Sequence, residues 1–102
     1  EDLRVYRRAN RGEHVALAAP GVGVEAAAPG GFASYTGTSF ASPYVAALAA
    51  SLLVEPDPAA VVAVRTRLQA AALDLGAPGP DPIYGHGLAR PPAAAPRRVA
   101  SR

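Results

Sequence analysis

The side chain best placed for chemistry in this sequence is Ser39, within the segment GTSFASPY at positions 37–44. The pattern after it predicts a helix. A helix N-terminus offers free N–H groups and a partial positive charge to the oxyanion that forms when a serine attacks a carbonyl. Gly37 allows a sharp turn before the serine and leaves room for a substrate chain. Pro43 falls within the first helical turns, where its missing N–H costs least. The alternative is that Ser39 only caps the helix, which is the usual role of a serine there.

Short extended segments precede this serine. The sequence HVALA at 14–18 predicts a strand that the Ala-Pro-Gly sequence at 19–21 would end. Residues 22–27 and 32–36 predict two further extended segments, and Pro-Gly-Gly at 29–31 predicts the turn between them. We therefore expect a hairpin that leads into Ser39.

Two helices are expected after the hairpin. Residues 39–54 carry apolar side chains at helical spacing with small residues on most other faces, which is typical of a buried helix. Asp57 and Pro58 predict the N-cap and first residue of a second helix, with Gly76 as its stop. This helix is amphipathic and hence peripheral, and its expected apolar positions are Val61, Val64, Leu68, Ala72 and Leu75. An irregular loop over 77–87 follows it.

Composition limits the possible classes. The chain has 102 residues and a formal net charge of +2, so it is too short for two domains and too weakly charged to suggest a nucleic-acid partner. It has no Cys, which excludes disulfides, a thiol nucleophile and a thiolate zinc site. The longest apolar stretch, 45–54, is about half of a membrane span. Because the chain begins with Glu1 and lacks the apolar core of a signal peptide, we expect a piece of a longer protein or a mature product.

The segment GTSFASPY followed by VAAL resembles the nucleophile-serine motif of the subtilase family of serine proteases. HVALAAPGVGV at 14–24 is similar to a strand and Ala-Pro-Gly turn of that family, and 32–36 to the strand that leads into its serine. The region from Pro56 resembles its C-terminal helix, and DPIYGHGLAR at 81–90 resembles the stretch that closes its catalytic domain. The family often has Met and His where this chain has Phe40 and Tyr44, which we expect to be core residues beside the active site.

The resemblance implies a triad in the order Asp, His, Ser, with an oxyanion-hole Asn between the His and the Ser. Asp2, Asn10 and His14 precede Ser39, but none has the family's sequence setting. The short stretch between Asp2 and His14 also cannot hold the intervening strands of a parallel sheet. We interpret these three as surface residues. Without a base, the Ser39 hydroxyl is a weak nucleophile at neutral pH.

Two other groupings are rejected. Ser39, Asp81 and His86 follow the chain order of an α/β-hydrolase triad, but Ala41 stands where the nucleophile elbow needs Gly, and the chain is too short for that sheet. His86 is interpreted as a loop histidine with a backbone partner. A calcium site is not expected either, because the aspartates do not have the spacing of a calcium-binding loop. Capping and turn roles are expected for these three residues, Asp57, Asp74 and Asp81. No cofactor or metal site is predicted.

The sequence thus predicts an α/β fold: over 1–90, the C-terminal part of a subtilisin-like parallel-sheet catalytic domain. The Pro/Ala/Arg-rich residues 91–102 are interpreted as a disordered tail, with a basic anchoring role for Arg97, Arg98 and Arg102 as the alternative.

The function expected from the resemblance is serine-type endopeptidase activity with Ser39 as nucleophile. Gly37, Thr38 and Pro43 are the associated motif residues near the substrate cleft. The implied partners are a polypeptide substrate and the upstream remainder of the catalytic domain, and an extracytoplasmic location is favoured. The rival interpretation is a non-catalytic pseudoprotease remnant or interaction module.

Overall fold

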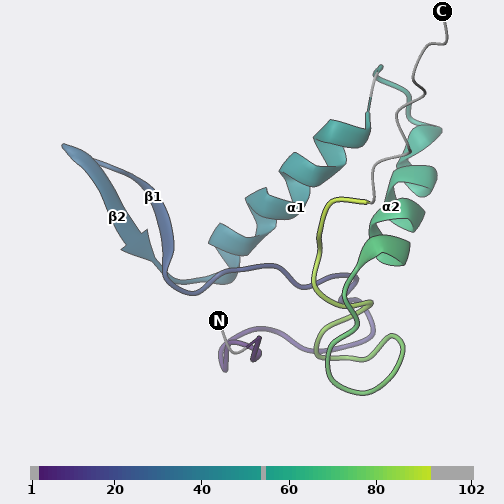
Figure 1. Cartoon of the computed structure of the whole chain (residues 1–102), viewed down its shortest axis with the longest axis horizontal. Helices are drawn as coiled ribbons and strands as arrows, with labels where there is room; N and C mark the ends of the chain where they lie inside the picture. The colour runs from purple at the N-terminus through teal and green to yellow at the C-terminus, as the bar shows by residue number, and fades with distance from the viewer. Residues whose placement is uncertain (1–2, 54, 93–102) are drawn as a thin grey trace, which may run out of the picture.

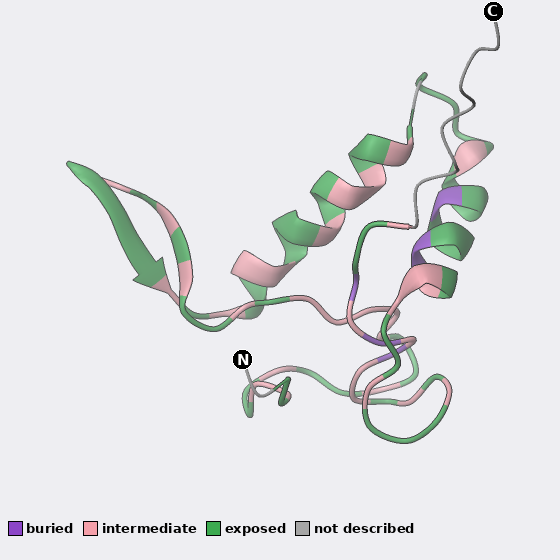
Figure 2. Cartoon of the chain, in the orientation of Figure 1, coloured by how far each residue is buried: buried purple, intermediate pink, exposed green. Residues whose placement is uncertain are grey.

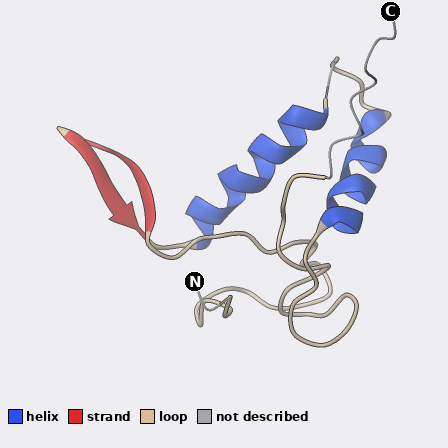
Figure 3. Cartoon of the chain, in the orientation of Figure 1, coloured by secondary structure: helices blue, strands red, loops and turns tan. Residues whose placement is uncertain are grey.

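The computed structural model describes residues 3–53 and 55–92 (Figure 1). Its elements are the strands β1 (Val24–Ala28) and β2 (Gly31–Tyr35) and the helices α1 (Thr38–Leu52) and α2 (Ala60–Ala71). Irregular segments connect them and form the described parts of the chain before β1 and after α2, residues 3–23 and 72–92 (Figure 3). The α/β class is confirmed.

The predicted hairpin is confirmed. β1 and β2 pair antiparallel in a register that runs from Val24 opposite Tyr35 to Ala28 opposite Gly31. The connection uses Pro29 and Gly30, and Gly30 has a φ of 79°, a left-handed value that a side chain would disfavour. Figure 1 shows this hairpin projecting from the base of α1.

Helix α1 has nearly the expected range, but its burial differs from the prediction. It begins at Thr38 and ends at Leu52, and Val54 lies outside the described residues. Sequence predicts a buried helix, yet α1 has no buried residue in this chain. The physical reason is that α2 touches only one side of it, and the remaining described elements leave its other apolar faces exposed (Figure 2).

Helix α2 begins later and ends earlier than predicted. Asp57 Oδ1 accepts the Ala59 N–H at 2.9 Å, so Asp57 organises the turn, and the helix itself starts at Ala60. At the other end, Ala72 is extended, and Leu73 exchanges backbone hydrogen bonds of 2.9 and 2.8 Å with Leu88. This pairing draws the chain out of the helix before Leu75 and Gly76. Their assignment to the end of α2 was therefore wrong.

The core of the described chain lies between α2 and the segment 85–89 (Figure 2). Val64 and Leu68 on α2 are 8% and 4% exposed, and Ala89 is 1% exposed. Val61, predicted to share this apolar face, is 61% exposed, so the buried part of that face begins one turn later, at Val64.

The strand predicted over 14–18 is not formed. Ala18 makes only an isolated parallel bridge with Leu88, supported by hydrogen bonds from Ala18 N to Gly87 O (2.8 Å) and from Ala89 N to Ala18 O (2.7 Å). Residues 14–18 therefore pair on one side only. Their partner, the segment around Leu88, is irregular, so the pairing does not continue into a strand. This bridge is the one parallel strand contact among the described residues.

The described fold is open. Its accessible surface is 7901 Å², whereas a compact protein of 10.3 kDa exposes about 5400 Å². Its radius of gyration is 15.9 Å, against about 13 Å for a compact domain of this length. Neither described helix has the length and apolar character that crossing a membrane requires. Residues 93–102 of the predicted tail lie outside the described residues, so the boundary at 91 stays a prediction.

Candidate active site

Ser39 is the second residue of α1, and it is exposed. The residue before the helix, Gly37, has a φ of 159° and a ψ of 159°, a combination that is essentially restricted to glycine. No side chain caps this helix end, and its first turn has no acidic residue. The Phe40 N–H donates to the Gly37 carbonyl at 3.1 Å. The N–H groups of Thr38 and Ser39 and the positive end of the helix dipole are available to an anion beside Ser39.

A backbone contact holds the Ala-Pro-Gly turn against the start of α1. The N–H of Gly37 donates to the carbonyl of Gly21 at 2.8 Å. A Cβ on Gly21 would lie 2.8 Å from the Gly37 carbonyl oxygen and 3.1 Å from the Ala41 Cβ, so only glycine permits this approach. The hydroxyl of Thr36 also accepts the Gly23 N–H at 3.0 Å. Together these contacts fix the path of the chain into Ser39.

An aromatic stack spans the junction between the hairpin and α1. The rings of Tyr35 and Phe40 are stacked, with centroids 5.0 Å apart and an interplanar angle of 14°. Phe40 is half-buried, whereas Tyr44 is 41% exposed, so the expectation that Tyr44 is a core residue is wrong for this chain. Sequence reasoning missed the stack. The available signal was a pair of aromatic residues on either side of the strand-to-helix boundary.

Two other motif residues lie in the first part of the same helix. Thr38 is the first residue of α1 and is exposed, and Pro43 is an exposed residue inside the helix. Because Pro43 has no N–H, it cannot donate to the carbonyl of Ser39, four residues earlier. The helix therefore leaves both the N–H and the C=O of Ser39 without the usual helical partners.

The described residues supply no base for Ser39. No hydrogen bond joins its hydroxyl to any described group. His14 and Asn10 are exposed, in keeping with their interpretation as surface residues, and Asp2 lies outside the described residues. The candidate site therefore consists, in this part of the chain, of a nucleophile and a helix N-terminus.

Asp81 and His86 lie elsewhere. Both line a groove of about 320 Å³ that also includes Arg65 of α2 but not Ser39. Asp81 Oδ1 accepts the N–H groups of Ile83 (2.8 Å) and Tyr84 (2.7 Å), which is the predicted turn role. The backbone N–H of His86 donates to the Ala16 carbonyl at 2.9 Å. No triad of Ser39, Asp81 and His86 is formed.

The other two aspartates considered for calcium also have local roles. Asp74 Oδ2 accepts the Gly79 N–H at 2.6 Å, and Asp57 holds the turn before α2. Among the described residues there is no group of three or more His, Cys, Asp and Glu side chains that could hold a metal ion. Asp81 Oδ2 is buried without a hydrogen-bond partner in the described chain.

Comparison with known proteins identifies the family. The model of the subtilase family matches residues 4–87, a range that includes the hairpin, Ser39 and both helices. The chain belongs to the subtilase family. This membership confirms the resemblance carried by GTSFASPY and its flanking segments.

Several subtilases are similar to this chain over a limited part of their length. A subtilisin of Bacillus pumilus is 39% identical over 85 residues, which cover 82% of this chain and 30% of that protein. Subtilisin E of Bacillus subtilis is also 39% identical over 85 residues, which are 22% of its length. Alkaline elastase YaB of a Bacillus strain is 45% identical over 62 residues, 59% of this chain and 16% of that protein. The chain thus spans less than a third of these relatives. No solved structure matches it significantly.

Proposed function

We propose that this subtilase chain supplies the nucleophilic serine of a serine endopeptidase. The observation that carries the proposal is the position of Ser39, exposed at the uncapped N-terminus of α1 in a chain that matches the subtilase family. Subtilisin and elastase are the names of its relatives, which supports a polypeptide substrate.

In the proposed reaction, Ser39 Oγ attacks the scissile carbonyl carbon and forms a C–O bond. A histidine accepts the hydroxyl proton and then donates it to the leaving amine as the peptide C–N bond breaks. The carbonyl oxygen becomes an oxyanion, to which the Ser39 N–H donates. Water then attacks the acyl-enzyme and regenerates the serine. Gly37 and Thr38 border the cleft beside the scissile bond.

The histidine, the aspartate that orients it and the oxyanion-hole asparagine come from sequence outside this chain. The same upstream part of the domain covers the apolar faces of α1 that are exposed in the described chain. The 102 residues alone are therefore inactive, because the hydroxyl of Ser39 has no base to accept its proton.

Labelling with a fluorophosphonate probe tests the proposal. In the protein at its natural length, we expect rapid labelling that Ser39→Ala abolishes. Ser42→Ala is the matched control, because Ser42 is an exposed serine one turn further along the same helix, and it should leave labelling unchanged. The 102-residue chain should label no faster than its Ser39→Ala variant. Labelling of the natural-length protein that does not depend on Ser39 would overturn the proposal.

The alternative proposal is a non-catalytic remnant or interaction module. The absence of a base for Ser39 among the described residues favours it over an enzyme made of this chain alone. It requires that the natural-length protein fail to label and that the 102 residues unfold cooperatively as a soluble monomer. An isolated catalytic fragment would instead aggregate or bind a hydrophobic dye through α1.

A further inference from the structure

The segment 85–89 lies between the end of α2 and the part of the chain that enters the candidate site. Alternate residues of the segment are buried, namely Gly85, Gly87 and Ala89. On one side, its Leu88 exchanges two backbone hydrogen bonds with the chain that follows α2. On its other side lies the stretch that precedes the Ala-Pro-Gly turn at 19–21. The segment therefore joins two parts of the chain that are far apart in sequence.

Three backbone hydrogen bonds join this segment to the chain before the Ala-Pro-Gly turn. The Ala16 carbonyl accepts the His86 N–H at 2.9 Å. The Ala18 N–H donates to the Gly87 carbonyl at 2.8 Å, and the Ala18 carbonyl accepts the Ala89 N–H at 2.7 Å. A buried backbone group that loses its partner has no water to replace it, so such hydrogen bonds are costly to break. They fix the position of Ala18.

A short and stiff link leads from Ala18 to α1. The Pro20 ring restricts the backbone of this link. The next residue, Gly21, accepts the Gly37 N–H at 2.8 Å and so contacts the start of α1. Ser39 lies two residues beyond that contact. A displacement of Ala18 therefore has a direct route to the nucleophile.

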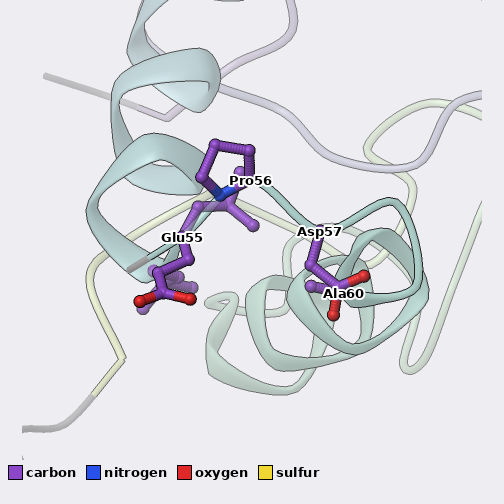
Figure 4. Close-up of a pocket in the computed structure, with 6 residues that line it drawn as sticks. Glu55, Pro56, Asp57 and Ala60 are labelled. Carbon is purple, nitrogen blue, oxygen red and sulfur yellow. The ribbon is translucent and has the colours of Figure 1, made fainter.

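The opposite end of α1 is held in a different way. It ends at the turn before α2, where a groove of about 530 Å³ opens (Figure 4). Asp57 accepts the Ala59 N–H there, and the Leu53 N–H donates to the Ala50 carbonyl, so these hydrogen bonds join residues two or three positions apart. The end of α1 that carries Ser39 is instead tied, through the Ala-Pro-Gly turn, to a segment near the end of the described chain.

We propose that the segment 85–89 positions Ser39 by holding the Ala-Pro-Gly turn against the start of α1. Gly85 is the positioning residue that permits the close contact. Its φ is 60°, and a Cβ there would lie 2.5 Å from both the carbon and the oxygen of the Ala16 carbonyl. The proposal rests on the proposed function of Ser39. Its consequence is that Ser39 reaches its full reactivity only when the segment 85–89 is docked.

Fluorophosphonate labelling and hydrogen exchange of the natural-length protein test the role of Gly85. Gly85→Ala should lower the maximal labelling rate about tenfold and change the probe concentration for half-maximal rate by less than about twofold. The reason is that a displaced nucleophile impairs bond formation rather than probe binding. The Gly37 N–H should exchange about tenfold faster, because its partner Gly21 is held less firmly. Gly79→Ala is the matched control. Gly79 also has a left-handed φ, but a Cβ there meets nothing within 4 Å, so this variant should change neither measurement.

A second variant tests the link itself and serves if Gly85→Ala does not fold. Pro20→Gly adds backbone freedom at an exposed position and leaves the hydrogen bonds of the segment 85–89 in place. We expect the Gly37 N–H to exchange about fivefold faster and the maximal labelling rate to fall about threefold. Pro78→Gly adds the same freedom at an exposed position in the loop after α2 and should change neither measurement.

The two measurements distinguish a failure of this proposal from a failure of the proposed function. If the natural-length protein does not label at Ser39, the proposed function is wrong, and the exchange of the Gly37 N–H still decides whether the segment holds the start of α1. Exchange and labelling at wild-type rates in both Gly85→Ala and Pro20→Gly would overturn the proposal. An equal increase of exchange at Gly37 and at the amides of α2 would also overturn it, because the whole chain would then be loosened rather than the route to Ser39.

Discussion

Helices α1 and α2 contact each other but contrast in composition and in environment. α1 is built almost wholly of apolar and small residues, and none of its residues is buried. α2 has charged and polar side chains at Arg65, Thr66 and Arg67, and yet it contains two of the most buried side chains of the described chain, Val64 and Leu68. Figure 2 shows this difference as purple on α2 and none on α1.

The difference in burial indicates that the two helices pack against different parts of the protein. α2 packs on the segment 85–89, which follows it in the same chain and is bound to it through Leu73 and Leu88. α1 precedes α2 and the segment 85–89 in the chain, and α2 is the one described helix that it contacts. An apolar helix that is exposed on several faces is unfavourable in water, because each buried apolar side chain would contribute about 1.5–3 kcal/mol. The proposal that further sequence covers α1 accounts for this exposure, whereas α2 is already packed against another segment of the described chain.

The largest effect on stability is expected at Gly87, where the segment 85–89 lies against the backbone of Leu73. A Cβ there would lie 2.1 Å from the Leu73 carbonyl oxygen, and the φ of 121° already disfavours a side chain. Gly87→Ala should lower the free energy of unfolding by about 4 kcal/mol or more, since backbone atoms on both sides must move.

Gly79→Ala is the matched control for this substitution. Gly79 has a φ of 79°, but a Cβ there would meet nothing within 4 Å. Only the conformational cost remains, about 1–2 kcal/mol. Denaturant unfolding of the natural-length protein compares the two variants. Equal effects would mean that the contact of 85–89 with Leu73 does not anchor α2.

Local patterns predicted most elements of this fold, because turns and helices depend on residues close in sequence. Pro-Gly-Gly at 29–31 located the hairpin, and the small and apolar residues after Ser39 located α1. The end of α2 and the missing strand at 14–18 depend instead on a distant segment, 85–89, which bonds to Leu73 and Ala18. Periodicity contains no information about that contact.

For the candidate site, the motif predicted which serine to examine but not what holds it in place. The Gly21–Gly37 hydrogen bond and the Tyr35–Phe40 stack join residues whose types alone do not specify a contact. The burial of α1 could not be judged either, because burial depends on every element around a helix. The apolar composition predicted a buried helix, but it could not show that the described residues leave α1 without a buried side chain.

A pair of truncations tests whether α1 is covered in the whole protein. Leu68→Ala on α2 should cost about 2–5 kcal/mol of stability, because Leu68 is 4% exposed in the chain itself. Leu48→Ala on α1 should cost as much in the natural-length protein, although Leu48 is only half-buried in the described chain. Val62→Ala, at a position 73% exposed, is the surface control and should change stability by less than about 0.5 kcal/mol.

Denaturant unfolding of the natural-length protein again gives the comparison. If Leu48→Ala resembles Val62→Ala rather than Leu68→Ala, then α1 is exposed in the protein as a whole. The proposal that an upstream catalytic domain packs on α1 would then be wrong. Together with a failure of the natural-length protein to label at Ser39, this result would favour the non-catalytic alternative.

The smallest effect is expected at Tyr35, which joins the hairpin to the uncovered end of α1. Tyr35→Leu removes the stack on Phe40 and should cost about 0.5–1.5 kcal/mol, the contribution of an aromatic pair beyond its buried area. Tyr35→Phe keeps the ring and should cost less than half of that, because no hydrogen bond of the Tyr35 hydroxyl to a described residue is present. If the stack also positions Ser39, Tyr35→Leu should slow fluorophosphonate labelling more than Tyr35→Phe does at equal probe concentration. Equal rates for the two variants would show that the stack is not needed to position the serine, which the backbone contacts of Gly21 and Gly23 then hold.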